Sequence, residues 1–447
     1  MRERLLCGAA VGDITPDESW LPISQTHAGV NGWRNAKFAG ILDPLKLRVL
    51  ALQSGDRKAM IVTFDSGQIP SDDDEQMLVR LSERTGIPRE YILLFATHTH
   101  TAPNMAEDKK TLAYIRENHI DVPEFEKKQH AMNSRMLTVL EETVDQAWKN
   151  LRPARMGIGY GKSYINANRN VQYADRWNKG LNAEWHSDKT VAVIRFEDDE
   201  GKPVAFLVNY AVHAAVMFGN QCFGKDIGIS GDIPGLTCAM MEEKFDGAVA
   251  LWTSGAAGDQ NPIFMNTCFY PDPKTGVCVK EAIPNGDYHL LKVLSARHFA
   301  DILAANDKIR GMTDSLQIFG AEGDSICPGG ETIVEEPGNI FSRILRFEDG
   351  EDFRIRVKLL VLGSIALYGI GGELYSSIGE YVKEHSPLRH TLVVNHSIKN
   401  VKYILDDAAL EAGCVAAGEA RYKKGYVKEA LAHTLEDMLK EACYYFT

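Results

Sequence analysis

The chain has 447 residues, of which 45% are hydrophobic and 25% are charged, a composition typical of a globular protein with a sizeable core. Its net charge of −12 argues against nucleic acid as a partner, because phosphate backbones are bound by clustered Lys and Arg. The same charge argues against docking on anionic membranes. We therefore expect the partner to be a small molecule.

The sequence also predicts a cytoplasmic protein. The apolar stretch near the N-terminus is interrupted by Gly8, Gly12 and Asp13, so it is too short for an export signal. The most apolar window, residues 357–370, is too short to span a bilayer, and we expect no stable membrane insertion. The eight cysteines form no CxxC pair, which favours free thiols over a cysteine-rich zinc site.

Apolar runs bounded by turn residues predict strands, in chain order, over 5–15 (with a turn at its end), 49–52, 59–63, 91–97, 191–196, 203–210, 248–253 and, as a pair joined at Gly363-Ser364, 353–369. Helical patterns cover 71–85, 123–150, 233–244, 285–309, 374–385 and 427–442. This alternation predicts an α/β fold, a layered, mixed β-sheet core flanked by helices. No linker rich in Pro, Gly or Ser interrupts the chain, so we expect one domain over 1–447.

The sharpest local feature is Thr97-His98-Thr99-His100-Thr101, which follows the apolar run ending at Thr97. If the backbone is extended here, residues two apart point the same way and both imidazoles face one site. Side chains that follow a strand lie where α/β sheets form their sites. An isolated HxH pair also occurs by chance, so this motif carries weight only in combination with others.

Four further polar segments follow apolar runs or lie in glycine-marked turns. They are His213 after Asn209-Tyr210-Ala211-Val212, the turn Ser230-Gly231-Asp232, the small-residue segment Gly255-Ala256-Ala257-Gly258-Asp259-Gln260-Asn261-Pro262, and Gly371-Gly372-Glu373. Each alone is explained by a core histidine, a helix cap or a turn. Together they bring imidazoles and carboxylates, the ligand types of a zinc site with an open position for water, to several loops of one sheet. Mn, Fe or Ni accept the same ligand types.

These segments resemble the neutral/alkaline non-lysosomal ceramidase family. The likeness runs through the chain as ordered short blocks: GAAVGDIT at 8–15, THTHTAP at 97–103, Asn168-Arg169, Ala211-Val212-His213, Ser230-Gly231-Asp232, the segment from Ala257 to Pro262, Gly372-Glu373 and residues 400–403. The order of THTH, xVH and SGD is the most specific part. The resemblance implies the fold of the ceramidase catalytic domain and a zinc amidase.

The resemblance also implies roles for individual residues. His98 and His213 would be the histidine ligands of Zn²⁺, Glu373 the carboxylate ligand and Tyr403 the phenol ligand. His100 would lie beside the metal without binding it, and Arg169 would contact the substrate or the intermediate. A phenol fits such a site, because a nearby Zn²⁺ makes its proton easier to lose.

The sequence departs from the family pattern in three ways. The serine of the family's GDxSP block is replaced by Asn261, whose amide can donate to an oxyanion but cannot act as a nucleophile. The tyrosine-rich segment that follows the metal tyrosine is not reproduced after Tyr403. A C-terminal β-sandwich-like domain is not expected within the 447 residues. These departures argue against ceramide as the substrate and leave the ligand types intact.

The leading hypothesis is a zinc-dependent hydrolase that cleaves an amide bond of a small or polar substrate, with His100 or Asp259 handling the proton and Arg169 and Asn261 orienting the substrate. One alternative is a metal-dependent lyase or carbohydrate-modifying enzyme, for which Trp33, Trp177, Trp185 and Trp252 offer stacking surfaces, although core packing explains each tryptophan as well. Another alternative is a relative that binds a metal or ligand without catalysis.

Overall fold

The structure is a computed structural model that describes residues 4–24, 36–71, 74–105, 122–173, 176–276, 278–337, 342–398 and 401–446. Three larger sheets form its body. In spatial order they are β6 (Ile92–Ala96), β5 (Arg57–Phe64), β4 (Lys46–Ser54), β1 (Leu5–Asp13) and β7 (Arg152–Pro153); then β14 (Val249–Ser254), β12 (Pro203–Tyr210), β11 (Thr190–Glu197) and β8 (Arg155–Lys162); then β18 (Ile318–Val334), β19 (Ile344–Leu362), β20 (Ile365–Ile370) and β22 (His390–Val394).

Shorter strands extend from one end of these sheets. They are β10 (Arg176–Asn182), β9 (Asn166–Tyr173) and β15 (Gln260–Pro262); β13 (Ile227–Ile229), β3 (Lys37–Ile41) and β2 (Ile23–Ser24); the hairpin of β16 (Thr267–Pro271) and β17 (Cys278–Ala282); and the pair β21 (Glu373–Leu374) and β23 (Tyr403–Ile404). The helices are α1 (Asp74–Thr85), α3 (Val122–Lys149), α4 (Asp232–Lys244), α5 (Tyr288–Asn306), α6 (Ser376–Glu384), α7 (Asp407–Ala412) and α8 (Val427–Phe446).

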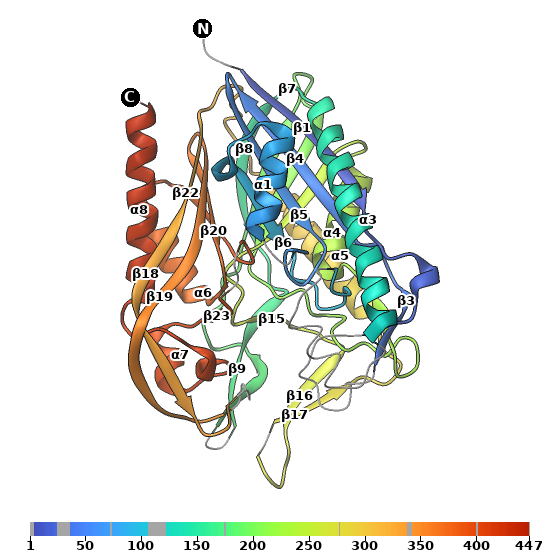
Figure 1. The fold of residues 1–447 in the computed structure, drawn as a ribbon, viewed down its shortest axis with the longest axis vertical. Coiled ribbons are helices and arrows are strands. Elements are labelled where there is room, and N and C mark those ends of the chain that lie inside the picture. The colour runs from blue at the N-terminus through green and yellow to red at the C-terminus, as the bar shows by residue number, and fades with distance from the viewer. Residues whose placement is uncertain are drawn as a thin grey trace.

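Alternation along the strands sorts the side chains into layers. On β11, Ile194 belongs to the large core that the second sheet shares with the first, whereas its neighbour Val193 faces the core filled by α4 and α5. On β19, Leu360 points to the large core and Leu359 to the core beneath α6 and α8. Figure 1 shows the result: α1 and α3 cover the first sheet, and α8 lies against the third. The predicted layered α/β fold is therefore confirmed.

The carboxyl ends of six strands meet at one edge of this assembly. Three parallel pairs, β5 with β6, β12 with β14 and β20 with β22, run their strands toward it. The amide of Asn395, after β22, donates to the carbonyl of Ser254 at the end of β14 at 2.8 Å. The amide of Ala96, at the end of β6, donates to the carbonyl of His396 at 3.2 Å. The loops that follow these strands are thereby held against one another.

Most predicted elements are confirmed, with two instructive differences. The helix expected over 285–309 begins at Tyr288, because Asn285 and Gly286 adopt positive φ and the Asp287 side chain caps the helix by accepting from the amide of His289. The long strand β18 was not predicted, since its sequence IFGAEGDSICPGGETIV contains four glycines and a proline, which normally interrupt strands. The expectation of a single domain stays a prediction.

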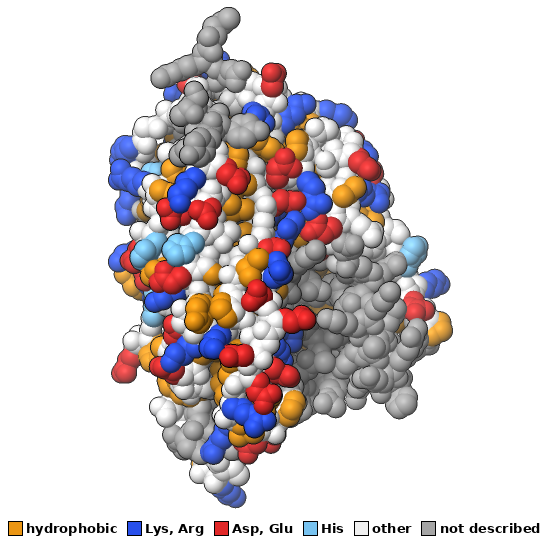
Figure 2. All heavy atoms as spheres, turned by 60° about the vertical axis from the view of Figure 1, so that its left-hand side comes forward, with side chains coloured by type: hydrophobic (Ala, Val, Ile, Leu, Met, Phe, Trp, Pro, Cys, Tyr) orange, Lys and Arg blue, Asp and Glu red, His pale blue; other side chains and the backbone are white. Residues whose placement is uncertain are grey.

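The surface is mixed in character. Figure 2 shows acidic and basic side chains interspersed with hydrophobic ones over the C-terminal elements. No helix in the described part of the chain combines the length and apolar composition needed to cross a membrane.

The packing of α3 on β1 depends on a glycine. A Cβ at Gly8 would lie 2.2 Å from the carbonyl oxygen of Ala147 in α3, so Gly8→Ala must separate helix and strand. We expect it to lower the free energy of unfolding by about 1–3 kcal/mol, the usual range for overpacking a well-filled core. Urea denaturation measures this loss. Gly323→Ala is the control, since its Cβ meets only the Met438 methyl at 3.5 Å, and an equal loss in both variants would contradict the close approach.

Candidate metal centre

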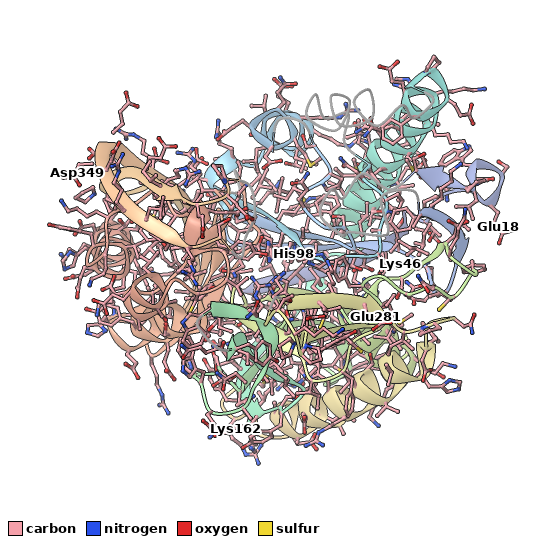
Figure 3. The ribbon with its side chains drawn as sticks, turned by 90° about the horizontal axis from the view of Figure 1, so that it is seen from below. Glu18, Lys46, His98, Lys162, Glu281 and Asp349 are labelled. Atoms are coloured by element: carbon pink, nitrogen blue, oxygen red, sulfur yellow. The ribbon has the colours of Figure 1, made fainter. Side chains whose placement is uncertain are left out.

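Titratable side chains gather where the strand ends meet. His98 follows β6, His213 follows β12, Glu373 follows β20 and His396 follows β22, and all four are buried. Figure 3 shows His98 near the centre of the molecule when that end is viewed directly. Ring centroids of His98 and His213 lie 5.1 Å apart although the two residues are 115 positions apart in the chain. The convergence predicted from the pattern of polar residues after apolar runs is therefore present.

The backbone at His98 differs from the extended conformation that the sequence suggested. His98 has a φ of 63°, in the left-handed region that non-glycine residues rarely adopt, so the extended HxH interpretation was wrong. His98 and His100 nevertheless lie close together, with ring centroids 4.6 Å apart. The Nδ1 of His98 is 2.6 Å from the carbonyl oxygen of Gly67, which accepts a hydrogen bond from it. The Nδ1 therefore carries the proton, and the Nε2 presents a lone pair to the site.

His213 is fixed in the same tautomer. Its Nδ1 lies 2.7 Å from the carbonyl oxygen of Ala257 and 3.1 Å from that of Gln260. Its backbone amide donates to Gln260 as well, at 2.9 Å. Burial, together with the positive charge of Arg169, lowers the pKa of His213 to about 4. The imidazole is therefore neutral near pH 7, and its Nε2 lone pair faces the site.

Both Nε2 atoms point at the same oxygen. The Glu373 Oε2 lies 3.2 Å from the His213 Nε2 and 3.6 Å from the His98 Nε2. Three electron-rich atoms this close, in a buried place, repel one another unless a positive charge lies among them. Two imidazoles and a carboxylate are the donor types that zinc binds in catalytic sites. The residues therefore fit a divalent metal ion, and the proton positions imposed by the carbonyl groups favour it.

Two more histidines belong to this cluster. His396, which the sequence analysis missed, stacks on His98 with ring centroids 3.7 Å apart and planes inclined by 12°. Within the described residues, two overlapping donor sets occur, His98 with His100 and His213, and His98 with Glu373 and His396; within each set the donor atoms lie within 4.8 Å of one another. His396 follows the apolar run Thr391–Val394, so the pattern that indicated His98 also points to it.

Arg169 and Tyr403 line the site beside His213. The Nη1 of Arg169 is 3.3 Å from the Nε2 of His213, and its guanidinium carbon lies 4.8 Å from the centre of the Tyr403 ring. Tyr403 pairs with Glu373 in the two-stranded parallel sheet of β21 and β23, which carries its side chain to the cluster. Burial raises the pKa of the Tyr403 phenol above its usual range. Tyr403 thus lies near the other predicted ligands as a neutral phenol.

Asp259 joins neighbouring segments of the site through hydrogen bonds. Its carboxylate accepts hydrogen bonds from Asn168 Nδ2 at 2.8 Å and from the amide and hydroxyl of Ser376 at 2.8 and 2.9 Å. Its carbonyl oxygen accepts from the amide of Arg169 at 2.8 Å. Asn261, buried in β15, lies opposite Ala167 of β9. Asp259 therefore holds β9, and with it Arg169, against the loop after β14.

The tryptophans named as candidate stacking surfaces have different surroundings. Trp252 is buried in the core beneath α4 and α5. Trp177 and Trp185 lie with ring centroids 4.6 Å apart and pack, like Tyr403, against the small cluster around Tyr375 and Leu405. Trp33, like Asn400 of the last resemblance block, lies outside the described residues.

The layered sheets and the buried histidine–carboxylate cluster define an α/β fold with a candidate metal centre. Residues 31–279, more than half of the chain, match the family model described as neutral/alkaline non-lysosomal ceramidase, N-terminal. The chain therefore belongs to the neutral/alkaline non-lysosomal ceramidase family, as its sequence motifs indicated. The match includes His98, His100, Arg169, His213 and Asp259, and ends before Glu373.

Solved structures extend this likeness over the whole fold. The neutral ceramidase from Pseudomonas aeruginosa superimposes with a TM-score of 0.70 at 17% identity, covering 98% of this chain and 75% of that one. A structure titled ceramidase complexed with C2 gives a TM-score of 0.70 at 16% identity, covering 98% and 76% of the two chains. At identities this low, the superpositions show that the fold is shared and nothing more.

The position of Glu373 depends on Gly258. A Cβ at Gly258 would lie 2.4 Å from the carbonyl oxygen of Glu373, so Gly258→Ala must displace that segment. We expect about a tenfold or greater loss of zinc affinity, the scale seen when residues that support ligands are changed. Titration against a fluorescent chelator measures it. Gly323→Ala is the control, because its Cβ meets only the Met438 methyl at 3.5 Å. Unchanged affinity in Gly258→Ala would remove Glu373 from the ligand set.

Proposed function

We propose that this protein is a zinc-dependent hydrolase that cleaves an amide bond in a small or polar substrate rather than in ceramide. The observation that carries the proposal is the convergence of two imidazole Nε2 atoms on one carboxylate oxygen, 3.2 and 3.6 Å away. Membership of a ceramidase family supports hydrolysis as the reaction class. The change from serine to Asn261 argues against ceramide.

The proposed ligands are His98, His213, Glu373 and Tyr403. His396 competes with Tyr403 for the fourth place, because its ring stacks on His98 and its donor atom lies within 4.8 Å of those of His98 and Glu373. A zinc ion bound here supplies Lewis acidity, which lowers the pKa of a water and polarises a carbonyl group. Mn, Fe or Ni fit the same donor types.

The chain's own residues would do the remaining work. His100 is the better candidate for handling the proton, since the Asp259 carboxylate is already engaged by Asn168 and Ser376. Arg169, adjacent to His213, would orient the substrate carbonyl and stabilise developing negative charge. Asn261 would donate its amide to the same oxygen without forming a covalent intermediate. Asp259 acts as a positioning residue for Arg169.

A lyase or carbohydrate-modifying reaction is the second candidate. The observation that favours it is the pair Trp177 and Trp185, which packs beside the same cluster as Tyr403 and offers aromatic surface near the site. Polarisation of a carbonyl group next to an acidic C–H bond requires no serine, so the same donor set suits elimination.

The metal content tests the first part of the proposal. Purified wild-type protein is expected to hold about one zinc per chain, and His98→Ala and His213→Ala are each expected to lose it, since each removes one donor from a small set. Inductively coupled plasma mass spectrometry measures this. His298→Ala is a matched control, because His298 is equally buried but lies in the core against Tyr210 and Trp252. Wild-type protein that neither contains nor binds metal would sink the proposal.

The reaction class is tested with a panel of small amides and glycosides in water enriched in ¹⁸O. Hydrolysis is expected to place one labelled oxygen in the acid product, and elimination is expected to leave an unsaturated product without label. Mass spectrometry of the products separates the two. An unsaturated product that wild type forms and His213→Ala does not would show that the enzyme is a lyase rather than a hydrolase.

A further inference from the structure

Two lysines from different strands approach the candidate metal centre together. Lys179 lies in β10 and Lys280 in β17, where Lys280 pairs with Phe269 of β16. The ammonium groups of both lysines lie near the Phe269 ring, 6.0 and 5.8 Å from its centre. The Cys278 Sγ lies 3.8 Å from the carbonyl oxygen of Lys179, which brings the hairpin alongside β10. The β16–β17 hairpin therefore adds its positive charge to that of β10.

Contacts connect these lysines to the histidine cluster. The Lys280 Nζ lies 4.4 Å from the centre of the Phe218 ring, and that ring lies 5.2 Å from the ring of His100. Lys179 pairs with Asn170 in β9, the residue after Arg169. The two lysines thus reach the site from the side of His100 and Arg169.

The charges in this region repel one another. Burial lowers the pKa of Lys280 to about 8. Burial, followed by the charges of Arg169 and Lys280, holds the pKa of Lys179 well below its usual range, and Glu373 offsets this only in part. Among the described residues, three basic side chains, Arg169, Lys179 and Lys280, thus lie around Glu373, in a chain whose net charge is −12. A zinc ion at the centre would increase the excess of positive charge, and an anion would relieve it.

Resting on the proposed amide hydrolysis, we propose that Lys179 and Lys280, together with Arg169, bind an anionic group that the substrate carries close to its scissile amide. The substrate class is then an acylated amine that also bears a carboxylate or phosphate, such as an N-acylated amino acid. An anion bound beside the two lysines would raise their pKa values again and so favour the protonated form of both amines. Arg169 would serve both the anion and the carbonyl group because it contacts His213.

Binding of a matched pair of ligands to the full chain tests this proposal. The probes are N-acetylglycine, which carries a carboxylate, and N-acetylglycinamide, its neutral counterpart. Isothermal titration calorimetry on zinc-loaded and metal-stripped protein gives the dissociation constants. We expect N-acetylglycine to bind about tenfold or more tightly than the amide in both forms. Lys179→Gln and Lys280→Gln are expected to remove this preference, and Lys280→Arg to retain it.

Lys292→Gln is the matched control. Its ammonium group also lies over an aromatic ring, 5.3 Å from the centre of Tyr288, but Lys292 is exposed on α5. We expect this variant to keep the wild-type preference. Inorganic phosphate, titrated in the same way, separates the anion types: tighter binding of phosphate than of N-acetylglycine would assign the pocket to phosphorylated substrates.

The outcome for the lysines is independent of the outcome for hydrolysis. A carboxylate preference that survives both Lys→Gln changes, or that disappears on removal of zinc, would assign the anion to the metal and overturn the proposal. A preference that persists in metal-stripped protein and is lost in the lysine variants supports it. That result stands even if no amide is hydrolysed, in which case the proposed function alone would fail.

Discussion

The site depends on one electrostatic constraint, the meeting of two imidazole lone pairs and a carboxylate in a buried place. Backbone carbonyl groups on the outer side of His98 and His213 fix the Nδ1 protons, so both Nε2 atoms must face Glu373. Buried electron-rich atoms repel one another, so the arrangement needs positive charge beside it; the Arg169 guanidinium, 3.3 Å from the His213 Nε2, supplies part of this charge, and a bound metal ion would add to it. The fold stabilises the arrangement through the loops, each of which hydrogen-bonds to a neighbouring strand end.

The sheet topology explains why these loops meet. Parallel pairs direct the ends of β5, β6, β12, β14, β20 and β22 to the same edge, and hydrogen bonds from Ala96 and Asn395 join loops that belong to different sheets. The left-handed backbone at His98 and His396 is strained, and such strain persists only where surrounding contacts over-determine it. Both residues carry the rings that stack at the centre of the cluster. The contacts that hold the left-handed backbone at these two residues therefore also fix the positions of their rings.

The sequence predicted the parts of this protein that local patterns control. Apolar runs gave most strands, and the polar residues that follow them led to His98, His213 and Glu373. It failed where tertiary contacts override local preference: β18 pairs with β19 despite its glycines and proline, and the backbone at His98 is not extended. His396 carried the same signal as the others and was overlooked. Lys179 and Lys280 gave no signal, because only the packing of the β16–β17 hairpin beside β10 brings them together.

The region around the histidines is divided by charge. In the described part of the chain, Glu373 is the only residue whose carboxylate approaches both imidazoles. The carboxylate of Asp259 instead accepts hydrogen bonds from Asn168 and Ser376. Basic side chains lie nearby as well, with Arg169 beside His213 and the charges of Arg169 and Lys280 acting on Lys179. Burial weakens the screening of these charges by solvent, so their interaction with a bound ligand is stronger than it would be at the surface. An anionic group on the proposed substrate would balance part of this charge, whereas a neutral lipid would not.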